Sequence, residues 1–180
     1  MLLVQVGGSS GIGLSTVKHF LRKGVKPCIA DINEKTGRAA QEELKNLGHE
    51  VGFVALDITS NESIQAGIKS AADILGVIDF AVNTAGITGP MTPMHELEDD
   101  QYYKITRIDM DGCFKFMKYI LQYFRAQEPR FIRHDEGVAW EPVYQRGSLV
   151  NLASSIATVC QPLLGAYCRF DANVTVVESC

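Results

Sequence analysis

The sequence predicts an α/β fold in which helices cover both faces of a doubly wound parallel sheet. Short apolar runs alternate with longer amphipathic stretches, and a glycine-rich turn at 7–13 separates the first run from the first amphipathic stretch. Consecutive parallel strands need a crossover connection of a dozen or more residues, which is usually a helix. At 180 residues, we expect one three-layer α/β/α domain with a hydrophobic core of ordinary size.

Five strands and four helices are expected in the order of the chain. The strands are the apolar runs at 2–6, 26–30, 51–56, 77–82 and 148–152. The helices are the amphipathic stretches at 11–23, 33–47, 60–75 and 99–126. Asn33 and either Ser60 or Asn61 are the expected N-caps, while Gly48 and Gly76 are expected to end their helices.

Two segments depart from this regular pattern. Residues 127–146 predict an irregular insertion that carries Trp140 and Tyr144. A loop of that length is either functional or disordered, and the sequence favours a disordered surface loop. The tail at 168–180 is atypical, because the β-branched run at 174–177 favours a strand where a helix is expected.

Composition points to an ordinary globular protein without a nucleic-acid or membrane partner. Hydrophobic residues make up 46% of the chain, charged residues 21%, and the net charge is −4, which leaves no basic footprint. The apolar start of the chain stops at Gly7, too early for a signal segment or a membrane span. Five scattered cysteines without a C-x-x-C pair predict reduced thiols in the cytoplasm, with neither a disulfide nor a metal site.

The turn at 7–13 has the composition of a phosphate-binding loop, with the spacing G-x3-G-x-G. Glycines permit a tight turn and let backbone N–H groups approach a pyrophosphate at a helix N-terminus. A flexible Gly/Ser linker is the alternative, but a strand before the turn and a helix after it favour binding. The candidate cofactor-binding residues are Gly7, Ser9, Ser10, Gly11, Ile12 and Gly13.

Asp31 follows the second expected strand, 18 residues after Gly13. An acid about 20 residues past the glycine motif accepts hydrogen bonds from a ribose hydroxyl of the dinucleotide. A carboxylate there repels a 2′-phosphate, so we expect NAD as the cofactor, with NADP as the alternative. An ordinary loop aspartate is the competing interpretation.

Together these motifs resemble the short-chain dehydrogenase/reductase family, whose glycine motif is T-G-x-x-x-G-x-G. Val6 stands in place of the threonine, and Thr84 replaces the second asparagine of the family's N-N-A-G turn. The resemblance implies a Rossmann-like fold, and a contact between Asp57 and the adenine ring. The further cofactor-binding residues that it implies are Asp57, Ile58, Asn83, Ala85 and Gly86.

The resemblance also implies hydride transfer between nicotinamide and a small ketone or secondary alcohol. Ser154 would position the substrate oxygen, with Ser155 as the adjacent alternative, and Tyr167 would act as acid and base. Asp109 stands where the family usually has an asparagine of the proton relay, and is the third catalytic candidate. A homo-oligomer is a further expectation.

Two departures from the family bear on activity. Asp171 stands where the lysine of the Y-x-x-x-K motif belongs, and a carboxylate raises the pKa of a neighbouring tyrosine where a lysine would lower it. Members of the family also continue through at least two more strands and a substrate-covering loop. The C-terminal strands of the sheet are therefore expected to be missing.

Three hypotheses remain open on the sequence. The first is an NAD(P)-dependent oxidoreductase, and the second is a nucleotide-binding remnant that is catalytically impaired because it lacks the active-site lysine. The third is a chain without a stable fold, since a sheet that ends at its fifth strand exposes an apolar edge.

Overall fold

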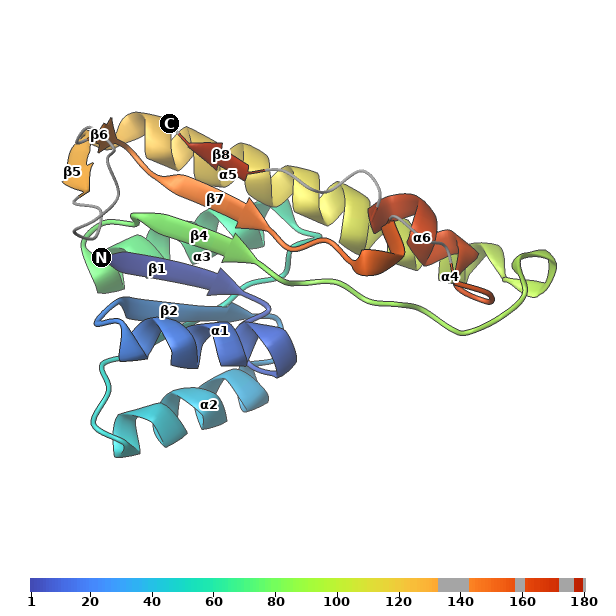
Figure 1. Ribbon diagram of the computed structural model, residues 1–180, viewed down its shortest axis with the longest axis horizontal. Helices are drawn as coiled ribbons and strands as arrows, with labels where there is room; N and C mark the ends of the chain where they lie inside the picture. Colours follow the sequence, from blue (N-terminus) through green and yellow to red (C-terminus); the bar gives the residue numbers. More distant parts are fainter. Residues whose placement is uncertain (133–142, 158–160, 172–176, 180) are drawn as a thin grey trace.

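The computed structural model describes residues 1–132, 143–157, 161–171 and 177–179. Its main sheet has the strand order β3-β2-β1-β4-β7-β8, in which the first five strands are parallel and β8 is antiparallel to β7 (Figure 1). The predicted doubly wound parallel sheet is confirmed. The strands are β1 (Leu2–Val6), β2 (Lys26–Asp31), β3 (Gly52–Ala55), β4 (Phe80–Asn83), β7 (Ser148–Asn151) and β8 (Val177–Ser179).

The register of the parallel strands brings their carboxyl ends to one edge of the sheet. Val6 pairs with Ala30 of β2 and with Asn83 of β4, and Asn83 pairs with Asn151 of β7. The strand order reverses direction between β1 and β4, which is where open α/β sheets bind ligands.

Helices cover both faces of the sheet, as predicted. In Figure 1, α1 and α2 lie on one face, and α3 and α5 lie on the other. The helices are α1 (Gly11–Arg22), α2 (Glu34–Asn46), α3 (Asn61–Leu75), α4 (Asp99–Ile105), α5 (Cys113–Ala126) and α6 (Gly165–Asp171). A short 3₁₀ turn, η1 (Met94–Glu96), precedes α4, and another, η3 (Ser155–Ala157), follows β7.

The predicted helix caps are present. The Asn33 side chain accepts a hydrogen bond from Thr36 N at 3.1 Å, and the Ser60 hydroxyl accepts one from Ser63 N at 3.2 Å. Ser60 is therefore the cap of α3, and Asn61 is its first helical residue. Gly48 and Gly76 follow the ends of α2 and α3 with φ of 85° and 87°, a conformation that favours glycine.

Each face of the sheet has its own apolar core. On the α3 and α5 side, Ile64, Phe116 and Ile120 are fully buried against strand residues such as Val4 and Leu149. The core on the α1 and α2 side is smaller, and its buried members are Val17, Ile29, Ala40, Leu44, Val51 and Phe53.

The helix predicted at 99–126 contains a π-helical segment, η2 (Thr106–Gly112), between α4 and α5. Sequence periodicity did not distinguish this segment from the α-helices on either side of it. The segment includes Asp109, which is buried, and π-helical turns occur frequently at functional sites.

The insertion at 127–146 is not irregular at its ends, which corrects the sequence prediction. β5 (Arg130–Ile132) and β6 (Val143–Gln145) pair as an antiparallel hairpin, and Phe131 stacks edge-on against Tyr144. Trp140 lies outside the described residues. In Figure 1 the hairpin lies at the amino ends of the sheet strands, away from the edge where the strands end. The described ends of the insertion therefore lie away from the candidate site.

The tail begins with a helix, α6, which includes both Tyr167 and Asp171. Most of the β-branched run predicted to form a strand lies outside the described residues, but Val177 begins β8. β8 pairs with β7 from Ser148 to Val150, so the fifth strand does not form the open edge that was expected. Within the described part of the chain, no helix has the length and apolar character needed to cross a membrane.

A buried carboxylate ties the hairpin to the sheet. Asp79 is 3% exposed and accepts hydrogen bonds from Leu2 N at 2.9 Å and from Arg130 Nη1 at 2.6 Å. Gln127 Nε2 donates to Ile78 O at 2.7 Å beside it. These contacts fix the neck of the insertion at the amino end of β4.

We expect Asp79→Ala to lower the free energy of unfolding by about 2 kcal/mol, because a buried N–H and a half-exposed guanidinium both lose their acceptor. Chemical denaturation followed by circular dichroism measures the change. Glu50→Ala is the control, since Glu50 pairs with Lys26 on the surface and its removal should leave the unfolding midpoint unchanged. Equal midpoints for the two variants would contradict a structural role for Asp79.

Candidate functional site

Two adjoining cavities lie at the carboxyl ends of β1 and β4, where the strand order reverses. The larger has a volume of about 590 Å³ and the smaller about 420 Å³. They share the wall formed by residues 84–87, which follow β4 directly. The two cavities therefore lie next to each other along the turn after β4.

The larger cavity gathers residues that lie at or just after the ends of four different strands. Among the sequence-predicted cofactor residues, those that line it are Gly7, Ser10, Asp31, Asp57, Ile58, Ala85 and Gly86. Ser9, Gly11 and Gly13 line neither cavity.

The glycine loop depends on a close contact between the start of α1 and the end of β1. A Cβ at Gly13 would lie 2.0 Å from the carbonyl oxygen of Gly7 and 2.7 Å from Thr84 Oγ1. Gly7 and Gly11 have φ of 68° and 50°, which other residues rarely adopt. The N-terminus of α1 therefore lies directly beside the cavity, and this loop fits a dinucleotide pyrophosphate.

Asp31 is held by the backbone on both sides of its carboxylate. Oδ2 accepts a hydrogen bond from Ser9 N at 3.1 Å, and Oδ1 accepts one from Asn33 N at 3.0 Å. The Ser9 hydroxyl also bonds to Thr36 Oγ1 at 3.0 Å, which joins the glycine loop to α2. Because each carboxylate oxygen can accept more than one hydrogen bond, Asp31 can still accept from ribose hydroxyls.

Asp57 is fixed in the turn between β3 and α3. Its Oδ1 accepts from Thr59 N and from Thr59 Oγ1, both at 2.8 Å, while its own N–H donates to Ser63 Oγ at 2.8 Å. Lys115 Nζ of α5 donates to Thr59 O at 3.1 Å and holds the outside of the turn. One carboxylate oxygen of Asp57 is thus committed to the turn.

Thr84 stands where the family has an asparagine, and its side chain links the end of β4 to the end of β1 at the glycine loop. Its hydroxyl donates to Val6 O at 2.8 Å and accepts from Gln5 Nε2 at 3.1 Å. Gln5 is fully buried in the middle of the sheet. Thr84 therefore supports the loop through its side chain, a role that the sequence comparison with the family motif did not indicate.

The smaller cavity brings together all three predicted catalytic residues. Asp109, Ser154 and Tyr167 line it, together with the predicted cofactor residues Ile12 and Asn83. Ser155, the adjacent alternative to Ser154, lines it as well. These residues come from η2, from the loop after β7, and from α6, so only the tertiary structure brings them together.

The Asn83 side chain, although it lines the smaller cavity, forms its hydrogen bonds with other residues of the protein. It is 3% exposed, its Oδ1 accepts from Ala85 N at 3.1 Å, and its Nδ2 donates to Asn151 Oδ1 at 3.2 Å. The same Nδ2 lies 3.6 Å from Cys113 Sγ. Burial raises the pKa of the Cys113 thiol to about 11, so this cysteine is a neutral wall of the cavity.

Asp109 supports the wall that the two cavities share. Its Oδ1 accepts a hydrogen bond from Ile87 N at 2.9 Å, and the residue is 7% exposed. A Cβ at Gly86 would lie 3.3 Å from the same oxygen. Asp109 thus holds the turn after β4 in place, and an asparagine would also accept this hydrogen bond.

Ser154 and Tyr167 are the groups that can act on a ligand in the smaller cavity. Ser154 Oγ accepts from Ile156 N at 3.3 Å, which leaves its hydroxyl proton available for donation. Tyr167 is partly buried in α6. Asp171 ends the same helix, and its side chain lies outside the described atoms, so the structure does not test the predicted effect of Asp171 on Tyr167.

Several cavity residues were not anticipated from the sequence. Lys104 and Arg107 line the larger cavity from α4 and η2, and Cys113 lines the smaller one from α5. The helical periodicity of 99–126 could have placed these residues on one element. It could not show which flank of the helix faces the cavities, because that depends on packing against the turn after β3.

The site has the composition and arrangement of a known family. The family model described as short chain dehydrogenase matches residues 2–169. This chain belongs to that family. Short-chain dehydrogenases are oxidoreductases with a Rossmann nucleotide-binding fold, and they use NAD or NADP on small alcohols or carbonyl compounds.

Curated relatives of the short-chain dehydrogenase family match most of this chain. The chain is 29% identical to 3-hydroxyacyl-CoA dehydrogenase type-2 of Rattus norvegicus over 172 residues, which cover 93% of this chain and 60% of the relative. It is 31% identical to the Drosophila melanogaster protein of the same name over 175 residues, which cover 93% and 62%. With 3beta-hydroxysteroid dehydrogenase 2 of Eggerthella lenta, 30% identity extends over 121 residues, 67% of this chain and 46% of the relative. The chain thus spans about half to three fifths of the length of these relatives.

Solved structures of short-chain dehydrogenases share the fold. A short chain dehydrogenase from Mycobacterium smegmatis superposes with a TM-score of 0.82 at 26% identity, covering 96% of this chain and 66% of that protein. NAD+-bound xylitol dehydrogenase superposes with a TM-score of 0.80 at 22% identity, covering 95% and 59%, and this likeness shows the fold alone.

We expect Gly13→Val to weaken nucleotide binding by at least tenfold, about 1.4 kcal/mol. The added side chain would displace the start of α1 from the Gly7 carbonyl and so move the backbone N–H groups that face the cavity. Fluorescence titration with NADH measures the affinity, and circular dichroism confirms that the variant is folded. Ser15→Val is the control, because it adds a valine at an exposed position of the same helix that lines neither cavity. Unchanged affinity in a folded Gly13→Val protein would show that the glycines serve only the turn.

Proposed function

We propose that this chain is an NAD(H)-dependent oxidoreductase that interconverts a ketone and a secondary alcohol. The observation that carries the proposal is the pair of adjoining cavities. One contains Asp31 and the glycine loop, and the other contains Ser154 and Tyr167. A dinucleotide that binds Asp31 with its adenosine half can extend along residues 84–87 to the catalytic candidates.

The residues of the larger cavity suit the adenosine half and the pyrophosphate of the cofactor. Asp31 would accept hydrogen bonds from the adenosine ribose, Asp57 and Ile58 would contact the base, and the N-terminus of α1 would face the pyrophosphate. Ile12, Asn83, Ala85 and Gly86 would contact the remainder, Asn83 chiefly by holding the turn after β4. The carboxylate of Asp31 disfavours a 2′-phosphate, which supports NAD(H) over NADP(H).

The residues of the smaller cavity suit proton transfer to a carbonyl oxygen. Bound nicotinamide would supply or accept the hydride, and the protein would orient the substrate and move the proton. Ser154 would donate a hydrogen bond to the substrate oxygen, while Tyr167 would transfer a proton at its phenolic oxygen. Asp109 would keep the shared wall in position through Ile87.

A second candidate is an NAD(H)-binding protein with little turnover, and Asp171 favours it. Residues four apart on a helix are neighbours on its surface, and α6 contains both Tyr167 and Asp171. A carboxylate near a tyrosine disfavours the phenolate, whereas catalysis by Tyr167 needs the phenolate to form readily.

We also propose a substrate class, an assembly and a location for this chain. A small alcohol or carbonyl compound is the proposed substrate, and a homo-oligomer is the proposed assembly, on the basis of family membership alone. A cytoplasmic location is supported by the free cysteines Cys28, Cys113 and Cys168, which are buried as thiols.

We expect NADH to bind more tightly than NADPH, because the 2′-phosphate would face the Asp31 carboxylate. Asp31→Ala should narrow the difference between the two affinities. Titration of each nucleotide against the wild-type and variant proteins measures it. Tighter binding of NADPH by the wild-type chain would reverse the assignment of the cofactor, and equal affinities would remove the argument from Asp31.

The second candidate predicts that turnover of simple ketones is slower than that of an ordinary reductase by about 10² to 10⁴-fold, because Asp171 would weaken proton transfer by Tyr167. The assay follows NADH oxidation with a panel of ketones, with Tyr167→Phe as the matched control. Turnover within tenfold of an ordinary reductase that is abolished in Tyr167→Phe would reject the second candidate. It would also show that another group supplies the positive charge, and Arg169 would be the first to test.

A further inference from the structure

We propose that Arg107 contacts the adenine base of the dinucleotide and contributes to the selection of adenosine-bearing cofactors. The proposal rests on the proposed NAD(H) function and adds a residue that the glycine, Asp57 and N-T-A-G motifs do not include. Arg107 lies in the π-helical segment η2 and lines the larger cavity together with residues 56–59.

The packing of η2 places Arg107 next to the turn that bears Asp57 and Ile58. A Cβ at Gly112 would lie 2.9 Å from Ile58 Cγ2, 3.2 Å from Ile58 O and 3.3 Å from Arg107 O. Because Gly112 has no side chain, the backbone of η2 lies directly against this turn. Arg107 and the turn residues 56–59 line the same cavity, so Arg107 lies at the end of the cavity where the base is proposed to bind.

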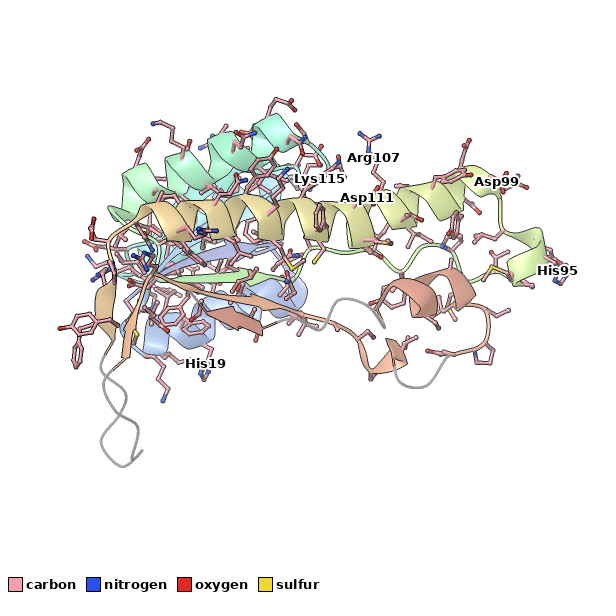
Figure 2. The ribbon with its side chains drawn as sticks, turned by 90° about the horizontal axis from the view of Figure 1, so that it is seen from above. His19, His95, Asp99, Arg107, Asp111 and Lys115 are labelled. Carbon is pink, nitrogen blue, oxygen red and sulfur yellow. The ribbon has the colours of Figure 1, made fainter. Side chains whose placement is uncertain are left out.

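A second contact fixes the same arrangement from α5. Lys115 Nζ donates to Thr59 O at 3.1 Å, so the turn contacts the helix at Thr59 as well as at Ile58. Figure 2 shows the Arg107 and Lys115 side chains projecting from the helix on the side where α3 lies. Lys115 is occupied by the turn, whereas Arg107 extends at the rim of the cavity.

The Arg107 guanidinium is available to a ligand. Its side chain is exposed, and none of the ion pairs identified among the described residues involves it. A guanidinium is planar and stacks on aromatic faces. This geometry suits the purine ring of the cofactor better than it suits a ribose. Asp57 would meet the base from the turn and Arg107 from the helix, so that the base lies between two elements.

The test compares three variants by fluorescence titration with NADH and by competition with ADP-ribose. Arg107→Ala should weaken both ligands by the same factor, about five- to tenfold. Arg107→Lys keeps the charge but not the planar group, and should remain weakened. Lys118→Ala is the control, because it removes one positive charge from α5 outside both cavities and should bind both ligands like the wild type.

The outcomes separate this proposal from the proposed function. A wild-type chain that binds neither NADH nor ADP-ribose would reject the NAD(H) function and this inference with it. A wild-type chain that binds both, with Arg107→Ala equal to Lys118→Ala, would reject the role of Arg107 alone. Full affinity in Arg107→Lys would show general charge attraction instead of base contact, and a loss for NADH without a loss for ADP-ribose would place Arg107 at the nicotinamide half.

Discussion

The close contact of Gly13 with Gly7 and Thr84 is the constraint on which the site depends. It allows α1 to begin directly beside the end of β1, and any side chain at Gly13 would overlap the Gly7 carbonyl. Thr84 completes the contact by donating to Val6 O, so β1, β4 and α1 meet at one point. The two cavities lie on either side of this junction, and a ligand that spans them would pass over it.

The second half of the site is organised by the long helix that the π-helical segment interrupts. The π-helical segment packs on the turn after β3 through Gly112 and supports the turn after β4 through Asp109. The segment thus touches both the base-binding turn and the wall shared by the two cavities. A regular α-helix would present different side chains to these two turns, because a π turn rotates every residue that follows it.

The substitutions relative to the family differ in their physical consequences. Thr84 provides a donor and an acceptor that both find partners in the protein, and Asp109 makes a hydrogen bond that an asparagine could also accept. Both are compatible with the fold and with cofactor binding. Asp171 is different, because an acidic residue stands where the family has a lysine, four positions after the proposed acid/base Tyr167, and we expect it to bear on the reaction.

Much of the fold could be predicted because it depends on local patterns. The apolar runs, the Asn33 and Ser60 caps and the glycines that end α2 and α3 each act within one helix or turn, and the structure confirms them. The hairpin formed by β5 and β6 escaped prediction, since its short strands have little periodicity and pair across ten residues. The antiparallel placement of β8 also escaped prediction, because packing in the folded chain determines which strands pair.

The sequence by itself determined the fold class, the glycine loop and the position of Asp31 after the second strand, because spacing along the chain sets each of these. Only the tertiary structure decided which side chains share a cavity. Asp109, Ser154 and Tyr167 come from three segments, and Arg107 lines the larger cavity from η2, which packs on Ile58 through Gly112. The physical reason is that a helix presents several flanks with similar composition. Contacts between residues far apart in the chain select the flank that faces the site.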